Sequence, residues 1–491
     1  MGSNGSEDKE SGCRFTIAIV GGGFAGATLA AQVLRKSKGA VSVALIERSP
    51  RLGRGVAYGT KCDKHLLNVR AQNMSAFPDD SEHFLRWARL NHSPAVKPGD
   101  YLPRRLFGQY ASWVLQEEIE RYPGQLTHVQ DEALGLNRVN LDGAGDVTIR
   151  LRSGASVHAS QVVLALGNFP PGEPRLPGKT EHSQRYVGNP WAGRAMRDAE
   201  QDQNVLLIGS GLTSVDVAIE LRERGFAGTV HMLSRRGLLP QSHRATAPWP
   251  PFWNESSPRT VRGLLRLIRT QVEAAERKGS DWRAVIDSVR PFTQEIWRSL
   301  SRQERRRFLR HVRPYWEVHR HRIAPEIASS LAAQMQSGQI ATHAGRIMEY
   351  REDDKGVEVK YRERESGKLR RLRLDRVINC TGPESDCRRI ESSLLSDLML
   401  QKLVRPDPLF LGLDASTEGA LLDALGEASG FLYTLGPARK ESLWETTAVP
   451  EIRRQAAELA EHLLVTLAPT RSAQLRETLH TTPTVAQHSA V

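Results

Sequence analysis

The sequence is poor in the residues and segments that define several protein classes. It has four cysteines in 491 residues, and no two of them form a C-x-x-C pair, so neither a redox dithiol nor a zinc site is indicated. The only stretch resembling a membrane span, residues 15–34, is interrupted by four glycines. The first dozen residues are polar and do not make a signal peptide. We therefore expect a cytoplasmic protein without a metal site.

Acidic residues are outnumbered by basic ones, 56 to 68, which gives a formal net charge of +12. The basic residues are spread along the chain, with short runs at 305–307 and 368–371, and no nucleic-acid-binding module surrounds them. A solvated basic surface that also favours anionic cofactors explains this charge better than nucleic acid binding does. Residues 310–322 are crowded with histidine, arginine and aromatic side chains, but they lack metal-ligand spacing. We expect them to form an interface or a substrate wall.

A glycine-rich element near the N-terminus carries the strongest signal in the chain. An apolar run at residues 16–20 ends at Gly21, Gly23 and Gly26, and helix-forming residues follow. This is the G-x-G-x-x-G pattern, in which the glycines permit a tight turn, close approach of a pyrophosphate and close packing of helix on strand. The next apolar run ends at Glu47, where a carboxylate can accept hydrogen bonds from a ribose. The pattern predicts a dinucleotide-binding domain.

A second version of this element begins at residue 204. An apolar run is followed by Gly209 and Gly211, and the third glycine is replaced by the small Ser214. The strand predicted after it ends in Ser234-Arg235-Arg236 rather than in an acid. Because a ribose 2′-phosphate requires cations where a bare ribose requires a carboxylate, the second site should prefer NADPH to NADH.

Both glycine elements lead through a predicted antiparallel meander, at residues 127–157 and 340–374, to a buried strand that ends in glycine, Gly167 or Gly382. This order indicates an internal duplication of architecture. The fold class is therefore α/β, with two Rossmann-like dinucleotide-binding domains, antiparallel meanders and a helical insert. The predicted division is a disordered tail at 1–12, a first domain at 13–200 and 383–468, a second domain at 201–382 with a helical insert at 255–335, and a disordered tail at 469–491.

Three further segments are expected to line the first site. The glycine-rich residues 51–60 and the apolar and amide residues 65–75 read as loops against a large flat ligand. A helix is predicted from about residue 101 to 122. Near the C-terminus a strand ends at Gly436, and a helix predicted from 448 to 467 should direct its positive dipole end beneath that glycine.

The order of these elements, with the second domain set inside the first, resembles the two-dinucleotide-binding-domain flavoproteins. The runs at residues 53–58, 65–69, 101–104 and 444–453 are similar to those of a bacterial FAD/NAD(P)-binding family. The resemblance implies FAD in the first domain and NADPH in the second. The residues expected to contact the two dinucleotides are Gly21, Gly23, Phe24, Ala25, Gly26, Glu47, Arg48, Asn68, Met74, Ser75, Arg104, Gly167, Gly209, Gly211, Leu212, Thr213, Ser214, Ser234, Arg235, Arg236, Gly382, Gly436 and Ala448.

Among such flavoproteins, the disulfide reductases need a dithiol beside the flavin, which this sequence lacks. The N-hydroxylating and Baeyer–Villiger (class B) flavin monooxygenases carry F-x-G-x-x-x-H-x-x-x-[WY] between their glycine motifs. Here Leu176, Gly178, His182 and Tyr186 stand at that spacing, with leucine in the phenylalanine position. A true motif and a chance linker stay equally open.

The resemblance implies an NADPH-dependent flavin monooxygenase that inserts one oxygen atom of O2 into a small-molecule substrate, by N- or S-oxygenation or hydroxylation, through a flavin C4a-(hydro)peroxide. Asn68 is expected to hydrogen-bond near the flavin ring, and His182 to position the nicotinamide. Two alternatives stay open: an NADPH-dependent flavin reductase or oxidase that passes electrons to a quinone, a protein or O2, and a redox-sensing binding protein. The sequence does not identify the substrate. It also does not decide the oligomeric state, and a homo-oligomer stays open.

Overall fold

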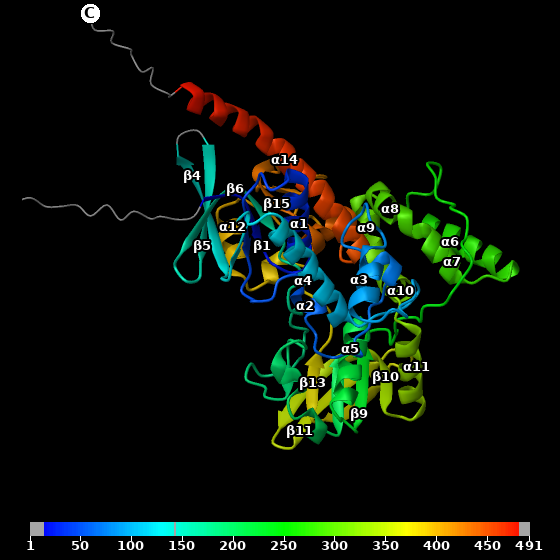
Figure 1. The fold of residues 1–491 in the computed structure, drawn as a ribbon. Helices are drawn as coiled ribbons and strands as arrows, with labels where there is room; N and C mark the ends of the chain where they lie inside the picture. Colours follow the sequence, from blue (N-terminus) through cyan, green and yellow to red (C-terminus); the bar gives the residue numbers. More distant parts are fainter. Residues whose placement is uncertain (1–13, 142–143, 481–491) are drawn as a thin grey trace, which may run out of the picture.

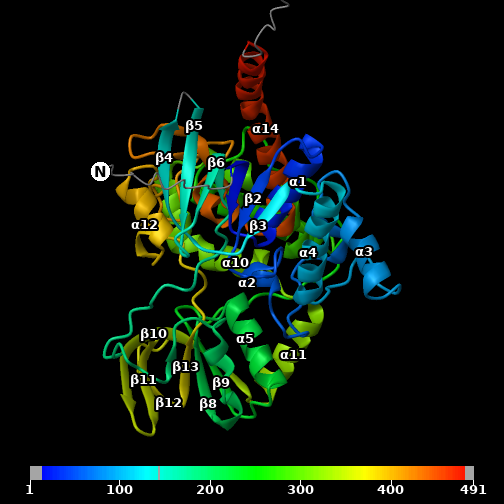
Figure 2. The same cartoon turned by 60° about the vertical axis from the view of Figure 1, so that its left-hand side comes forward.

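The computed structural model describes residues 14–141 and 144–480, and it contains two sheets that stand one above the other in Figures 1 and 2. The predicted tail at 1–12 lies outside the described residues, as do residues 481–491 of the second predicted tail. In the described part of the chain, no helix is both long enough and apolar enough to cross a membrane.

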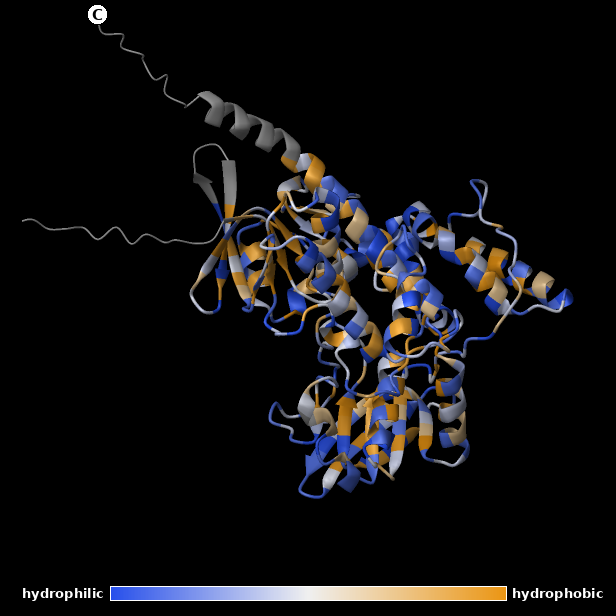
Figure 3. Cartoon of the chain, viewed as in Figure 1, coloured by the Kyte–Doolittle hydropathy of each residue, from blue (hydrophilic) through white to orange (hydrophobic). Residues whose placement is uncertain are grey.

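The first sheet has a parallel centre. Its order is β14 (Ala420–Leu422), β15 (Ala428–Thr434), β6 (Ser156–Leu164), β1 (Arg14–Val20), β2 (Val43–Ile46) and β3 (Leu126–Val129), and β5 (Ala144–Leu151) pairs antiparallel with β6 and with β4 (Ala133–Leu141). The central strands are apolar on both faces because helices α1 (Phe24–Ser37), α4 (Arg104–Arg121) and the start of α14 (Val449–His480) cover one face. The meander and α12 (Ser393–Leu400) cover the other. Figure 3 shows the resulting apolar interior.

The second sheet repeats this plan. Its order is β12 (Leu369–Leu374), β11 (Gly356–Glu363), β10 (Ile340–Asp353), β9 (Thr229–Ser234), β8 (Asn204–Ile208), β13 (Arg376–Asn379) and β7 (Tyr186–Val187). The strands β9, β8, β13 and β7 are parallel to one another, and β10 joins them in parallel before it turns into an antiparallel meander with β11 and β12. The predicted α/β class and the duplicated architecture are confirmed.

Three details differ from the sequence prediction. Strand β7 belongs to the second sheet, although residues 186–187 fall in the range predicted for the first domain. Strand β3 pairs in parallel with β2, so the first antiparallel meander consists of β4, β5 and β6. Helix α14 continues to His480, past the end predicted near residue 467. Local patterns identify strands well, but pairing partners are set by tertiary contacts.

The predicted helical insert comprises α6 (Val261–Arg277), α7 (Trp282–Val289), α8 (Thr293–Ser299), α9 (Arg302–Arg307), α10 (Arg313–Arg320) and α11 (Pro325–Gln336). Although it interrupts the second domain in sequence, most of it packs on the first. Trp297 of α8 stacks on Trp444 with ring centroids 4.8 Å apart, and Arg290 pairs with Glu451 of α14 at 3.1 Å. In Figure 1, α8 and α9 accordingly lie beside α14, away from β9 and β11. The insert therefore joins the two domains.

Candidate active site

The turn after β1 has a shape that only glycine can adopt. Gly21 has φ +107°, and a Cβ on it would lie 2.3 Å from the carbonyl oxygen of Ala165. A Cβ on Gly26 would lie 1.9 Å from the carbonyl oxygen of Gly21. Gly23 is the N-cap of α1, and no side chain caps this end of the helix. The backbone N–H groups of Phe24 and Ala25 at the start of the helix can therefore bind an anion. This cradle fits a dinucleotide pyrophosphate.

Glu47 lies at the carboxyl end of β2, directly beside this turn. Its carboxylate accepts hydrogen bonds from the backbone N–H of Gly22 and from that of Ser49, both at 2.9 Å. These two contacts fix the carboxylate at the edge of the sheet where a ribose would lie next to the pyrophosphate. The neighbouring Arg48 is exposed.

The residues before α14 lie close to the start of α1. A Cβ on Gly436 would lie 3.8 Å from the Cβ of Ala25, and Gly436 has φ +78°. Its N–H donates to the Gln455 side chain at 3.0 Å, and the Thr446 hydroxyl donates to its carbonyl at 2.8 Å. Because Ala448 directly precedes α14, the positive end of that helix lies near the turn of β1.

The predicted ligand loops also reach this place. The N–H of Gly53 donates to the carbonyl of Gly22 at 2.8 Å, and a Cβ on Gly23 would lie 3.5 Å from the Cα of Gly55. Tyr58, in the short helix α2 (Gly55–Tyr58), keeps part of its surface accessible although burial raises its pKa to about 12. Residues 52–60 therefore form one wall beside the glycine cradle.

Met74 and Ser75 are buried beneath the second loop, at 1% and 0% exposure. The Ser75 hydroxyl donates to the backbone carbonyl of Asp80 at 2.5 Å, and its own carbonyl accepts from Arg453 of α14 at 3.1 Å. In the structure these two residues shape the loop from within.

The second glycine turn repeats the geometry of the first. Gly209 has φ +124°, and a Cβ on it would lie 2.4 Å from the carbonyl oxygen of Cys380. Gly211 is the N-cap of α5 (Leu212–Glu223), and a Cβ there would meet nothing within 4 Å. Ser214 is fully buried in the position of the third glycine, while Leu212 and Thr213 are partly exposed on the first helical turn.

The residues after β9 are arranged around one stacked arginine. Ser234 accepts hydrogen bonds from the N–H of Gly237 at 2.9 Å and from the hydroxyl of Ser210 at 2.8 Å. Arg235 is exposed, whereas the guanidinium of Arg236 lies 5.4 Å above the ring of Tyr315 in the insert. Two cations at the carboxyl end of β9 fit the predicted 2′-phosphate site.

Gly167 and Gly382 end β6 and β13 at the carboxyl edges of the two sheets. Each has a positive φ, +66° and +88°, and a Cβ on either would meet nothing within 4 Å. Open space beside both turns is where dinucleotides bind in such sheets.

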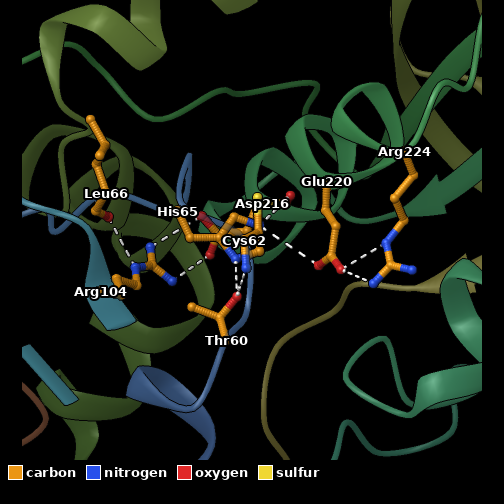
Figure 4. Close-up of polar contacts among 8 residues, drawn as sticks. All are labelled: Thr60, Cys62, His65, Leu66, Arg104, Asp216, Glu220 and Arg224. Carbon is orange, nitrogen blue, oxygen red and sulfur yellow. Dashed lines mark hydrogen bonds and ion pairs between the residues drawn. The ribbon is translucent and has the colours of Figure 1, made fainter. Parts of the chain in front are cut away.

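A polar cluster joins the two domains at α5 (Figure 4). Arg104, at the start of α4, forms a bidentate ion pair with Asp216 of α5 at 2.6 and 3.1 Å. The buried His65 donates from Nε2 to the backbone carbonyl of Asp216 at 2.9 Å and lies 3.8 Å from Glu220. The Nδ1 of His65 is 2.8 Å from the hydroxyl of Thr60.

Arg104 is therefore engaged with the second domain, although the sequence predicted it at the cofactor. Sequence reasoning missed Asp216 and His65, because a helix surface gives no signal of its partner in another domain. The Arg104 Nε also donates to the carbonyl of Leu66 at 3.0 Å, so each nitrogen of the guanidinium makes a hydrogen bond within the chain.

Asn68 lies where the two domains and the insert meet. Its backbone carbonyl accepts a hydrogen bond from Nε2 of His243 at 3.0 Å, and the His243 ring lies 5.0 Å from that of Tyr101. Burial lowers the pKa of His243 to about 4, with the nearby cation Arg322 of the insert acting in the same direction. The Asn68 side chain is partly exposed and makes no hydrogen bond with the described residues. It is available to a ligand.

His182 is not in this place. Strand β7 pairs Tyr186 with Val377, so residues before Tyr186 lie at the amino edge of the second sheet. Arg185 accordingly donates to the carbonyl of Asp375 at 3.2 Å, at the edge opposite Gly209. His182 is exposed there, and a nicotinamide at the carboxyl edge is out of its reach. The structure therefore does not bring His182 to the second glycine turn, and Leu176 and Tyr186, which stand at the same spacing, pack in the core of the second domain.

Comparison with known proteins agrees with this geometry. Residues 18–169 match the model of a family described as FAD-NAD(P)-binding. The first domain is an FAD/NAD(P)-binding domain. A comparison with curated protein sequences gives no match.

Solved structures share the fold of nearly the whole chain. The ornithine hydroxylase of Pseudomonas aeruginosa, in its reduced form, has a TM-score of 0.63 at 16% identity, covering 93% of this chain and 100% of that one. The ornithine N-hydroxylase of Kutzneria sp. 744, with reduced FAD, NADP⁺ and L-ornithine, has a TM-score of 0.61 at 13% identity, covering 92% and 99%. The thioredoxin reductase of Lactococcus lactis has a lower TM-score of 0.52 at 13% identity, covering 93% and 99%.

Proposed function

We propose that this protein is an NADPH-dependent flavin monooxygenase that acts on a small molecule. The overall reaction converts substrate, O2, NADPH and a proton to oxygenated substrate, water and NADP⁺. The observation that carries the proposal is the meeting of the FAD/NAD(P)-binding domain, the second domain and the insert beside Asn68, whose side chain makes no hydrogen bond with the described residues. The higher similarity to ornithine hydroxylases than to thioredoxin reductase supports it.

The residues present fit FAD in the first domain. No side chain fits at Gly21 or Gly26, so a pyrophosphate can lie directly against the backbone of this turn. Glu47 is held where its carboxylate can accept a hydrogen bond from a ribose hydroxyl. Bound FAD would supply the two-electron transfer and the activation of O2 that side chains lack. NADPH fits the second turn, where Arg235 and Arg236 replace the acid of the first.

The chain's own part in the reaction is to orient the reactants and exclude water. The Arg104–Asp216 pair holds α5, and with it the NADPH turn, against the first domain. The insert lies on one side of the place where the two domains meet at Asn68. The Asn68 side-chain amide can donate a hydrogen bond to, or accept one from, a flavin ring or substrate bound there. We also propose the cytoplasm, where NADPH is supplied, as the site of the reaction.

The deciding experiment supplies the FAD-loaded protein with NADPH, ¹⁸O2 and a panel of small amines and thioethers. A monooxygenase gives a product that carries one ¹⁸O atom, in a fixed ratio to the NADPH consumed. If NADPH is oxidised and all ¹⁸O is recovered as hydrogen peroxide with every compound, or if a quinone accepts the electrons instead, the protein is a flavin reductase or oxidase. Absence of any NADPH turnover would identify a cofactor-binding sensor.

Replacing Asn68 by Ala tests the contact at the centre of the junction. Because the variant loses an amide that can hydrogen-bond near the ring, it should release more peroxide per product formed, while FAD content stays normal. Unchanged coupling of NADPH oxidation to product would show that Asn68 has no part in the chemistry.

A further inference from the structure

The helical insert reaches the second nucleotide turn through one aromatic side chain. Tyr315 of α10 is 45% exposed, and its ring centroid lies 5.4 Å from the guanidinium carbon of Arg236, just after the end of β9. This distance is within the range of a cation–π contact. The contact therefore links a side chain of the insert to one of the two cations at the carboxyl end of β9.

The N–H donors of Arg236 are unused in the described part of the chain. The guanidinium makes no hydrogen bond or ion pair there, and its Nε is buried without an acceptor. A cation–π contact stabilises the positive charge, but it does not occupy the N–H donors. Because buried donors without acceptors are costly, they call for a ligand that supplies oxygen atoms. Arg236 is thus supported by an aromatic ring and open to an anion.

The backbone ties α10 to the segment that follows Arg236. Near the end of α10, the Val318 carbonyl accepts a hydrogen bond from the N–H of Gln241 at 3.0 Å. The Gln241 carbonyl in turn accepts one from the N–H of Ile323, also at 3.0 Å. Because these bonds lie a few residues from both side chains, the ring of Tyr315 and the guanidinium of Arg236 belong to one hydrogen-bonded unit.

This unit borders the second glycine turn. Ser210, which stands between the two glycines of that turn, has its Oγ 2.6 Å from the carbonyl oxygen of Leu238. Strands β8 and β9 are parallel, so β9 ends at the same edge of the sheet as the turn at Gly209. The ribose of a bound dinucleotide lies at that edge. A supported guanidinium with free N–H donors there matches the oxygens of a ribose 2′-phosphate.

We propose that Tyr315 is a positioning residue that holds Arg236 for the 2′-phosphate of NADPH, and that the insert thereby sets the preference for NADPH over NADH. The inference rests on the binding of NADPH at the second turn in the proposed function. It goes further, because it assigns coenzyme selection to a side chain outside both dinucleotide-binding folds. An arginine free in solvent loses rotamer freedom when it binds a phosphate, and the ring removes part of that cost in advance.

Two nucleotides that differ only in the 2′-phosphate test this role. The binding of adenosine 2′,5′-bisphosphate and of adenosine 5′-monophosphate to the FAD-loaded protein is measured by titration calorimetry. The variant Tyr315→Leu removes the ring, and leucine suits an exposed helix position, so folding is preserved. A cation–π contact at a partly exposed site accounts for about two- to fivefold in affinity, so the variant should bind the bisphosphate more weakly by about that factor. Its affinity for the monophosphate should not change.

Further variants separate the positioning of Arg236 from other roles of the ring. Tyr315→Phe keeps the ring and should bind the bisphosphate like the wild-type protein. In the background Arg236→Gln, which itself weakens binding of the bisphosphate, the change Tyr315→Leu should have no additional effect, because the ring has no cation to hold. Met335→Ala is the control: this residue of α11 is 37% exposed on the same insert, and both affinities should stay unchanged.

Turnover gives a second readout. When NADPH or NADH reduces the flavin, Tyr315→Leu should raise the KM for NADPH by about two- to fivefold and leave the KM for NADH unchanged. The kcat at saturating NADPH should also stay unchanged, because the contact acts at the ribose and not at the nicotinamide.

Four results would overturn the proposal: unchanged bisphosphate affinity in Tyr315→Leu, an equal loss with both nucleotides, an equal loss in Tyr315→Phe, or the same loss when Arg236 is already glutamine. A wild-type protein without preference for the bisphosphate would overturn it as well, and would remove the 2′-phosphate site with it. If that preference is present and Tyr315→Leu keeps it, only the role of the ring is lost. Because nucleotide binding needs no oxygen, these outcomes are separate from that of the ¹⁸O2 experiment.

Discussion

The ion pair between Arg104 and Asp216 should set the rate at which NADPH reduces the flavin. It is the bidentate contact in Figure 4 between the first domain and α5, the helix whose N-terminus carries the second glycine turn. The change Asp216→Asn keeps the size of the side chain and removes its charge. It leaves the Arg104 guanidinium without a carboxylate at a position where its side chain is only 17% exposed.

The expected cost follows from burial. Removing one partner of a buried ion pair costs roughly 3 kcal/mol, because the remaining charge stays desolvated. About 1.4 kcal/mol corresponds to a tenfold change in an equilibrium constant. The loss therefore lowers the population in which α5 is docked on the first domain about 100-fold, relative to arrangements in which α5 has come away from it. Flavin reduction requires the docked arrangement, so its limiting rate should fall by up to that factor.

The assay is anaerobic mixing of the FAD-loaded protein with saturating NADPH, with flavin absorbance as the readout. Arg224→Gln is the matched control: it breaks the pair with Glu220 one turn further along α5, where Arg224 is 49% exposed and the loss should be below about 0.5 kcal/mol. The combination Arg104→Met with Asp216→Leu should be more stable than Asp216→Asn, because no charge stays buried alone. A reduction rate for Asp216→Asn within twofold of wild type would refute the positioning role.

Three further predictions follow from the two nucleotide turns and the second sheet. Gly26→Ala should give protein with little bound FAD, measured as the flavin-to-protein absorbance ratio, because the new Cβ would lie 1.9 Å from a backbone oxygen. Replacing Arg235 and Arg236 by Ser should raise the KM for NADPH at least tenfold and leave that for NADH nearly unchanged; equal effects on both would show that the arginines do not contact a 2′-phosphate. Burial lowers the pKa of His231 to about 4, so the unfolded chain binds its proton first, and stability should fall as pH drops from 6.5 to 4, by about 1 kcal/mol once solvent screening of this partly exposed ring is allowed for. In His231→Gln the melting temperature should depend less on pH over this range.

The parts of the site that the sequence predicted are those determined locally. Gly21, Gly26 and Gly209 are required by the turn in which they stand, and a turn between a strand and a helix is encoded within a few residues. Glu47 follows its strand directly, so its place at the carboxyl edge follows from the chain direction. For the same reason, the meeting of Gly436 with the first cradle could be anticipated from strand order.

What the sequence could not predict depends on contacts between distant segments. The insert was expected to belong to the second domain because it interrupts that domain in sequence, but Trp297 and Arg290 dock it on the first. His182 stood at a suggestive spacing, but spacing does not say which edge of a sheet a residue faces. The pairing of β7 with β13, which decides that, is a tertiary contact. Asp216 gave no signal because a buried carboxylate on a helix is recognisable only with its partner.

The docking of the insert also explains how one duplicated fold can acquire a third function. The two nucleotide turns are built from the same strand-turn-helix unit, the first followed by Glu47 and the second by Arg235 and Arg236. The insert begins and ends within the second domain and packs against the C-terminal segment of the first. One of its side chains, Tyr315, also lies beneath Arg236, next to the second nucleotide turn. A change in the insert can therefore alter the surface beside the second nucleotide turn, while the glycine turns and the Arg104–Asp216 pair keep their own geometry.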